Sequence, residues 1–255
     1  MSRWSVVLPY YNETAYLRPT LESLFAQQLR DYRLILVDNA STDGSGDLAR
    51  ALAPGALHLQ ESRPGKINAL QCGLAAVETE FVAFCDADTF YPAHYLRRCD
   101  ELFASSDAVA VMAMDLPADH EGPAARRKRA KVMLVSRILS KQTHTGGFGQ
   151  SFRTEVLRKA GGFSADLWPF VLEDHEVMQR VFKYGRSAYA PDLWCIPSNR
   201  RKDRSGVGWT KAEQLLYHAT PFSLKDWFFY RFLANRFMAR ALDNTKLRRK
   251  DWNQY

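Results

Sequence analysis

Residues 81–90 read Phe81-Val82-Ala83-Phe84-Cys85-Asp86-Ala87-Asp88-Thr89-Phe90, a short apolar run that leads directly into two carboxylates. Such a run is typical of a strand buried in a parallel sheet, and ligands of these sheets bind beyond the carboxyl ends of the strands. Asp86 and Asp88 are expected on the same side of an extended backbone, where their like charges require a cation between them. Mg²⁺ or Mn²⁺ bridging to a diphosphate would meet that requirement. By itself the tripeptide also fits a solvated turn that ends a strand.

The chain around this stretch alternates between strand and helix patterns. Strands are predicted over 4–9, 34–37, 56–60, 108–114 and 188–196, the last interrupted by a turn, and helices over 17–25, 46–53, 67–77, 95–103 and 155–160. This alternation predicts a Rossmann-like α/β fold with a mostly parallel sheet and helices on both faces.

Three of the predicted strands end in polar loops. These loops carry Asn12 with Glu13, then Asp38, then Asp86 with Asp88. Because a parallel sheet brings the carboxyl ends of its strands to one edge, we expect a nucleotide-binding crevice there. Taken singly, Asn12 and Glu13 also fit a helix start, and Asp38 also fits a turn.

Length and composition favour one large α/β domain with a C-terminal extension. The chain has 255 residues, of which 46% are hydrophobic and 25% charged, so it can bury a substantial core and is unlike a disordered protein. The formal net charge is +7, and the excess lies in residues 126–141, 200–211 and 225–250. Such clusters indicate an anionic partner, which is a nucleotide diphosphate, an anionic membrane or a nucleic acid.

The cysteines and the apolar segments bear on the compartment. Cys72, Cys85, Cys99 and Cys195 have no C-x-x-C spacing, which favours a reducing compartment without a zinc site. No secretory signal follows Met1, and no uncharged apolar run reaches the roughly 18 residues of a membrane span. We therefore expect a cytoplasmic protein, either free or peripheral on the inner face of the plasma membrane.

Five motifs, in this order, resemble those of family 2 glycosyltransferases, inverting enzymes with the GT-A fold. The motifs are residues 6–13 (VVLPYYNE), 37–44 (VDNASTDG), 65–69 (GKINA), 86–88 (DAD) and 172–176 (LEDHE). The expected division is a GT-A domain over 1–215, with a nucleotide-binding half over about 1–115 and an acceptor half over about 116–215. A basic, aromatic, helical extension is expected over 216–255.

The resemblance also implies roles for single residues. Contacts to the nucleotide sugar are expected from Pro9, Tyr11, Asn12, Glu13, Asp38, Asn39, Lys66, Asp86 and Ala87, and contacts to Mg²⁺ or Mn²⁺ from Asp88 with Asp86. A carboxylate such as Asp38 can accept hydrogen bonds from a base edge or a ribose diol, and Lys66 suits a phosphate. A solvated loop cation is an equally good reading of Lys66.

An inverting transfer needs a base on the acceptor side. By resemblance Asp174 is the expected catalytic base and Glu173 the reserve, and repulsion from Glu173 and Glu176 is expected to raise the proton affinity of Asp174. The same acids also suit the first turn of a helix. His144, in a glycine-rich stretch, is either a contact to the diphosphate or the metal, or a surface histidine.

Three basic segments have two readings each. The predicted amphipathic helix over 126–141 either covers the core or lies on an anionic membrane. The loop 198–208 is either a lid over phosphates or a surface loop. The tail 221–255 either packs against the domain or inserts at a membrane interface.

The sequence therefore predicts a metal-dependent inverting glycosyltransferase acting in cell-envelope or exopolysaccharide synthesis. Its partners would be a nucleotide-diphosphate sugar and a glycan or lipid-linked acceptor, with no nucleic acid. The absence of a Gln-x-x-Arg-Trp sequence argues against a polymer-making synthase. A nucleotidyltransferase and a non-enzymatic nucleic-acid binder are the alternatives, although the first gives no reason for the 172–176 motif.

Overall fold

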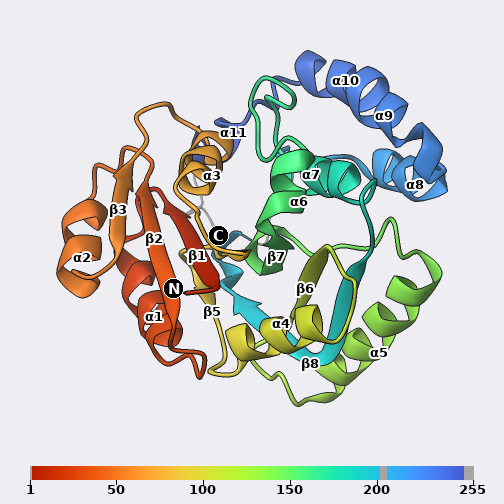
Figure 1. Cartoon of the computed structure of the whole chain (residues 1–255). Coiled ribbons are helices and arrows are strands. Elements are labelled where there is room, and N and C mark those ends of the chain that lie inside the picture. The colour runs from red at the N-terminus through yellow and green to blue at the C-terminus, as the bar shows by residue number, and fades with distance from the viewer. Residues whose placement is uncertain (1, 202–205, 250–255) are drawn as a thin grey trace.

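The computed structural model describes residues 2–201 and 206–249 (Figure 1). Within them, eight strands form one mixed sheet in the order β3-β2-β1-β4-β7-β6-β8-β5. The strands are β1 Trp4–Tyr10, β2 Tyr32–Asp38, β3 Leu57–Gln60, β4 Phe81–Phe84, β5 Thr89–Phe90, β6 Ala110–Asp115, β7 Gln150–Arg153 and β8 Ser187–Pro197.

The first half of the sheet is parallel, as the sequence predicts. Strands β3, β2, β1 and β4 run in the same direction, and the register pairs Tyr10 with Asp38 and Val7 with Phe84. The carboxyl ends of β1, β2 and β4 therefore share one edge. Strand β7 then runs antiparallel to both β4 and β6, while β8 is parallel to β6.

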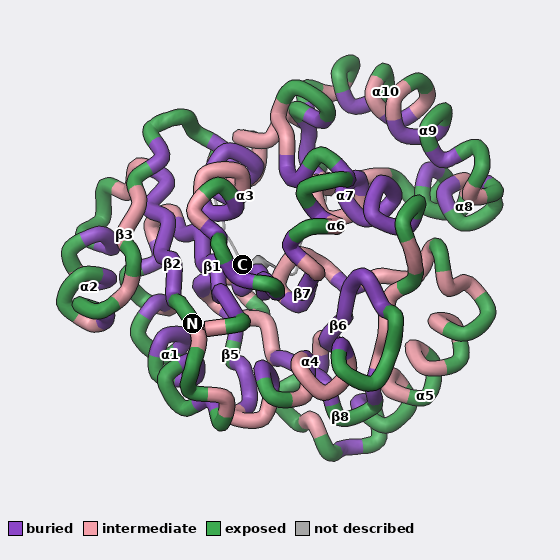
Figure 2. Tube along the Cα trace, viewed as in Figure 1, coloured by how far each residue is buried: buried purple, intermediate pink, exposed green. Residues whose placement is uncertain are grey.

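Helices cover both faces of the sheet (Figure 1). They are α1 Thr14–Phe25, α2 Ser45–Leu52, α3 Lys66–Ala75, α4 Tyr95–Ala104, α5 Pro123–Ile138, α6 Thr154–Lys159, α7 Glu173–Val181, α8 Lys211–Ala219, α9 Lys225–Trp227, α10 Ala234–Ala239 and α11 Lys246–Arg249. Along β1, Val6 and Leu8 pack on the face covered by α1 and α4, whereas Val7 packs with α3 and α7 on the other. Figure 2 shows the central strands buried and the outer side of α5 exposed.

The aromatic tail packs against the domain. A π-helical turn, Phe228–Leu233, joins α9 to α10. Phe228, Phe229 and Phe237 are fully buried in the same cluster as Trp168 and the inner side of α7. Of the two readings of the tail, packing is therefore the one that its described residues adopt.

One strand prediction is confirmed and another needs correction. Strand β4 ends at Phe84, so Asp86 and Asp88 lie in the loop after it, as expected, and Thr89–Phe90 form a separate short strand, β5, which pairs with β8. Strand β8 is continuous, and the expected turn is an irregularity in its pairing with β6. It coincides with Pro191, which has no N–H to donate to the ladder. No helix in the described ranges is long and apolar enough to cross a membrane.

Candidate active site

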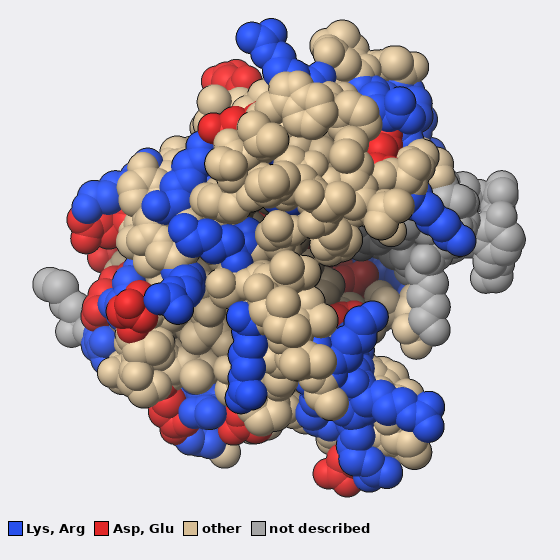
Figure 3. All heavy atoms as spheres, turned by 90° about the vertical axis from the view of Figure 1, so that its right-hand side faces the viewer, with Lys and Arg blue, Asp and Glu red and all other residues tan. Residues whose placement is uncertain are grey.

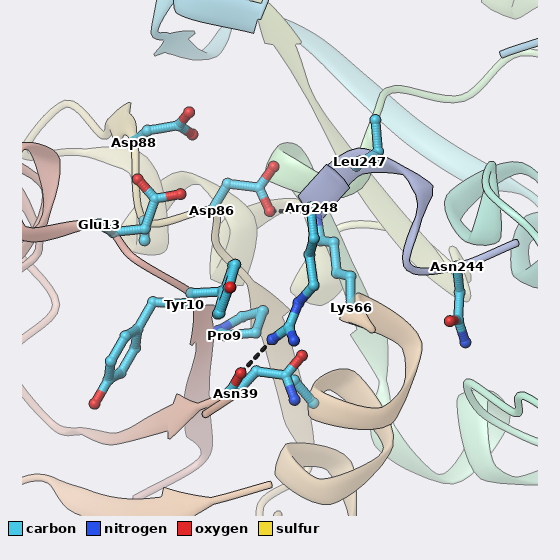
Figure 4. A pocket seen from close by; sticks show the side chains of 13 residues that line it. Pro9, Tyr10, Glu13, Asn39, Lys66, Asp86, Asp88, Asn244, Leu247 and Arg248 are labelled. Carbon is cyan, nitrogen blue, oxygen red and sulfur yellow. Dashed lines mark hydrogen bonds and ion pairs between the residues drawn. The ribbon is translucent and has the colours of Figure 1, made fainter. Parts of the chain in front are cut away.

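The loops that follow β1, β2 and β4 enclose a small cavity of about 90 Å³ (Figure 4). It is lined by Pro9, Tyr10, Tyr11, Glu13, Asn39, Lys66, Ala69, Asp86, Ala87 and Asp88, and by Asn244, Leu247 and Arg248 from the end of the chain. A second cavity of about 610 Å³ shares Lys66, Asp86 and Asp88 with the first and adds Glu173 and Asp174. The two spaces therefore meet at the Asp86-Ala87-Asp88 loop.

Left-handed backbone at three non-glycine residues shapes these loops. Asn12 (φ 53°), Ala40 (φ 58°) and Leu172 (φ 64°) lie in the loops after β1 and β2 and directly before α7. The side chain of Asn12 ties the first two loops together, since its Oδ1 accepts the Thr42 N–H at 2.8 Å. Such conformations cost energy and concentrate at functional sites.

Each carboxylate of the 86–88 loop forms an ion pair with a basic side chain. Lys66 Nζ donates to Asp86 Oδ1 at 2.5 Å, and Arg200 Nε donates to Asp88 Oδ2 at 2.9 Å. Arg200 also pairs with Glu13 and so bridges the loops after β1 and β4. Burial alone would lower the pKa of Lys66, but the nearby carboxylates, Asp86 first, raise it above its ordinary value, so Lys66 stays charged.

The two carboxylates of this loop suit a divalent cation whose other ligands are substrate phosphates and water. In the described ranges no three His, Cys, Asp or Glu side chains are grouped to hold an ion. Mg²⁺ sites commonly take one or two carboxylates and complete the octahedron with substrate phosphates and water, and Asp86 and Asp88 fit that pattern. Lys66 and Arg200 show that this loop attracts positive charge even without a metal.

Glu173 and Asp174 begin α7 on the wall of the larger cavity. Asp174 Oδ1 accepts from His175 Nδ1 at 2.8 Å and from the His175 N–H at 3.0 Å. Burial would raise the pKa of Asp174, but His175, His144 and Lys66 together hold it well below its usual range. The pKa of Glu173 is instead raised, because burial outweighs the attraction of Lys66 and the charge of Asp174 adds to the effect.

The expectation that acidic neighbours raise the proton affinity of Asp174 is therefore wrong. Glu176 is buried and is held by Arg180, whose Nε donates to it at 2.7 Å. Burial has the largest single effect on the pKa of Asp174 and raises it, but His175, His144 and Lys66 together outweigh burial.

Gly147 brings backbone close to the same charges. Its N–H donates to Asp174 Oδ2 at 3.1 Å. A Cβ at this position would lie 3.3 Å from Lys66 Nζ and 3.7 Å from Asp174 Cβ. A glycine is therefore suited to this close approach of the backbone.

His144 is half-buried beside His175. Its ring packs against that of His175 at a centroid separation of 4.3 Å, behind the pair that His175 makes with Asp174. Burial, and then His175, lower the pKa of His144 to about 3, so its ring is neutral. We find it among the lining residues of neither cavity.

Most of the predicted nucleotide-sugar residues line the small cavity, with two exceptions. Asn12 links two loops, and Asp38 caps its own turn by accepting the Ser41 N–H at 2.8 Å, so neither lines the cavity. Sequence reasoning missed Asn244, Leu247 and Arg248, because the only signal in the tail was its density of basic residues. The predicted lid over 198–208 contributes Ser198 and Arg200, and its residues 202–205 lie outside the described ranges.

A family model and several curated proteins match this chain. The model described as glycosyl transferase family 2 matches residues 5–161, more than half of the chain. An uncharacterised glycosyltransferase of Nostoc sp. is 33% identical over 169 residues, which cover 61% of this chain and 52% of that protein. The minor teichoic acid biosynthesis protein GgaA of Bacillus subtilis is 26% identical over 201 residues, covering 72% and 45%. The chain thus spans about half the length of these curated relatives.

Solved structures agree on the fold. A mannosyltransferase of Pyrobaculum calidifontis, in complex with GDP-Man and Mn²⁺, has a TM-score of 0.66 at 23% identity and covers 94% of this chain and 73% of its own. TarS of S. aureus, in complex with UDP, has a TM-score of 0.61 at 18% identity and covers 93% and 72%. The expected GT-A fold is therefore confirmed.

Proposed function

The chain belongs to glycosyl transferase family 2, and on that premise we propose that it moves a sugar from a nucleotide-diphosphate sugar to an acceptor hydroxyl with inversion at the anomeric carbon. The observation that carries this proposal is the meeting of two cavities at Asp86 and Asp88, one beside the nucleotide loops and one beside Asp174. Family membership removes the reasons for considering a nucleotidyltransferase or a nucleic-acid binder.

In this proposal the small cavity takes the nucleoside and the carboxylates face the diphosphate. Tyr11 and Asn39 line the nucleoside end, and Lys66 supplies a positive charge for a phosphate. Asp38 contributes by fixing the turn that presents Asn39, since it caps that turn through Ser41. Mg²⁺ or Mn²⁺ held by Asp88 and Asp86 would neutralise charge on the departing nucleotide.

The larger cavity takes the acceptor, and Asp174 removes the proton of the attacking hydroxyl. Its Oδ1 is fixed by two hydrogen bonds from His175, so the carboxylate is held in one orientation. Glu173, with its raised pKa, is the reserve base. The printed name of the Bacillus subtilis relative supports a glycan of the cell envelope as the product.

We propose further that the acceptor is linked to a lipid, and the surface of helix α5 supports this. Lys128 of α5 lines the larger cavity and pairs with Asp115 at 2.5 Å. Farther along the same helix, Leu134 and Ile138 are 59% and 70% exposed. Figure 3 shows a hollow on this side with acidic atoms inside and basic side chains along its lower rim. A helix with this surface suits an anionic membrane from which such an acceptor is presented.

The test is donor turnover combined with metal binding. The protein is incubated with a panel of nucleotide sugars, and release of the free nucleoside diphosphate is followed. Because the described part of the chain groups no three metal-ligating side chains, calorimetry should show tight Mn²⁺ binding only when a nucleoside diphosphate is present. Asp88→Ala should abolish this binding, and turnover should fall with it.

The control is Asp192→Ala, which removes an exposed carboxylate that pairs with Arg98 and lines neither cavity. It should bind Mn²⁺ and turn over donor as the parent protein does. Turnover that survives chelation by EDTA would contradict the metal proposal, and absence of turnover with every donor would contradict the transferase proposal.

A further inference from the structure

The last described helix, α11, returns to the nucleotide-binding half of the molecule. Asn244, Leu247 and Arg248 line the small cavity together with the loops after β1 and β2. Figure 4 shows the Arg248 side chain reaching down from α11 between Lys66 and Pro9, toward Asn39. Residues 244–248, which are about two hundred residues from the loop after β2 in sequence, thus contribute to the proposed nucleoside site.

Arg248 makes two contacts there that a nucleobase would also make. Its guanidinium carbon lies 3.6 Å from the centre of the Tyr11 ring, and its Nη2 donates a hydrogen bond to the Asn39 carbonyl. A planar cation stacked on an aromatic ring gains both cation–π and stacking energy. A nucleobase is likewise a planar group that stacks on aromatic rings and offers N–H donors to carbonyl oxygens.

The first residues of this segment are held in place by backbone contacts to the loop before α7. The Asn244 N–H donates to the Pro169 carbonyl at 2.9 Å, and Asp243 forms an isolated β-bridge with Phe170. The Asn244 side chain also lies against Gly65, where a Cβ would be 2.6 Å from its Oδ1. These contacts hold residues 243–249 across the mouth of the cavity.

With Arg248 in place, the remaining space is too small for a nucleoside. It measures about 90 Å³, whereas pockets for small molecules usually enclose roughly 300–1,000 Å³. A nucleobase stacked on this face of Tyr11 would therefore overlap the Arg248 guanidinium.

We propose that residues 243–249 form a strap whose Arg248 occupies the nucleobase position of the donor site, and that the donor's nucleobase displaces it to stack on Tyr11. This inference rests on the function proposed above. The strap is an internal competitor of the donor, because the apparent affinity for donor is reduced by the fraction of molecules in which the strap is open.

The test compares nucleotide affinities of variants that differ in one arginine. Arg248→Ala removes the stacked group, and Arg249→Ala, on the same short helix, removes an exposed side chain that pairs with Asp243 and is worth little. Titration calorimetry with UDP and with GDP should show that Arg248→Ala binds at least one of them about tenfold more tightly than the parent protein. Arg249→Ala should match the parent protein.

A second measurement follows the strap itself. Hydrogen exchange of the Asn244 amide, which is bonded to Pro169, should become faster when the preferred nucleotide is added to the parent protein. Arg248→Gln keeps a long side chain with N–H donors but loses the charge, and its affinity should lie between those of the parent protein and Arg248→Ala.

The outcomes separate the strap from the proposed function. Equal or weaker nucleotide binding by Arg248→Ala, or slower exchange at Asn244 on nucleotide addition, would overturn the strap, while the transferase proposal stands. Weaker binding would make Arg248 a ligand of the donor instead. If neither nucleotide binds the parent protein or Arg248→Ala, the strap proposal fails, whereas the transferase proposal is decided by turnover of the donor panel.

Discussion

At the scale of single residues, four carboxylates around the two cavities have different surroundings. Asp86 and Asp88 face Lys66 and Arg200, whereas Asp174 is held by His175 and, at its neighbour Glu173, burial outweighs the attraction of Lys66. When their surroundings shift the pKa values of neighbouring acids in opposite directions, these acids can perform different tasks in one site. Asp174 is ionised and fixed in orientation, so it is ready to accept a proton, although its low pKa limits its strength as a base.

Asp174→Asn should lower kcat by a factor on the order of 10²–10⁴ while leaving donor affinity nearly unchanged. Asparagine keeps the size of the side chain and one oxygen that can accept the hydrogen bonds from His175. Its amide nitrogen, in place of Oδ2, cannot accept the Gly147 N–H, and the side chain has no basicity. The measurement is steady-state kinetics with the donor found by the panel, combined with titration calorimetry for nucleotide binding. Product analysis by NMR should show the anomeric configuration opposite to that of the donor.

Glu173→Gln is the matched comparison, since it makes the same change at the adjacent residue. If the proton goes to Glu173, this variant loses the activity instead. The parent protein's kcat would then fall as the pH drops through the raised pKa of Glu173, because only the ionised carboxylate accepts a proton. With Asp174 as the base, no such acid limb arises from Glu173, because Asp174 stays ionised at lower pH.

The geometry of these residues was predictable in part. The short apolar strands and the carboxylates that follow them predict the common edge, because parallel pairing alone brings Glu13, Asn39 and Asp88 together. The pKa of Asp174 was not predictable, since it depends on His144 and Lys66, which approach it only through the tertiary fold. The roles of the site residues stay predictions until the variants are measured.

At the scale of elements, α5 differs from the other helices that cover the sheet. It packs through Ala125, Val132 and Met133 onto Trp194, and much of its remaining surface is open (Figure 2). Its pattern of basic and apolar residues predicted an amphipathic helix, and the structure gives the bounds Pro123–Ile138. The pattern could not distinguish a core-covering helix from a membrane-facing one, because both require one apolar face.

Arg127→Glu should weaken binding to vesicles of phosphatidylcholine and phosphatidylserine by about tenfold. A basic residue near an anionic surface contributes about 1 kcal/mol, and reversing its charge adds repulsion to the loss of that attraction. Arg127 is exposed on α5 and belongs to its basic run. The measurement is co-sedimentation over a range of vesicle concentrations at low and physiological salt.

Arg18→Glu on α1 is the control, because it makes the same charge change at another exposed arginine. It should bind vesicles as the parent protein does. Equal losses in the two variants would mean that only net charge matters, and no binding by the parent protein would remove the membrane from the proposal.

At the scale of the whole molecule, the tail joins parts that are far apart in sequence. Its middle contributes Phe228, Phe229 and Phe237 to the core beside α7, and its end places Arg248 over the nucleotide loops. Local sequence patterns could not predict this return, since the tail has no clean apolar stripe and its partners lie up to about two hundred residues away. We propose that the described part of the expected extension over 216–255 folds as one unit with the catalytic domain.

Phe237→Ala should therefore destabilise the entire molecule by about 3–5 kcal/mol, the usual cost of removing a buried phenylalanine from a packed core. Phe237 is fully buried, and its ring lies 5.9 Å from that of Trp168 and 6.0 Å from that of Phe170. Its carbonyl also accepts the Leu242 N–H at 3.0 Å, close to where the strap begins. The measurement is urea unfolding followed by tryptophan fluorescence, and a single transition should move to lower urea concentration.

Met238→Ala is the matched control, because Met238 is the next residue of α10 and is 68% exposed. Its change in the free energy of unfolding should stay within about 0.5 kcal/mol. If Phe237→Ala instead splits the unfolding curve, so that a minor early transition appears while the main one keeps its midpoint, the tail unfolds apart from the domain. The buried aromatic contacts would then not couple α10 to the sheet, and a separate C-terminal unit would be the better description.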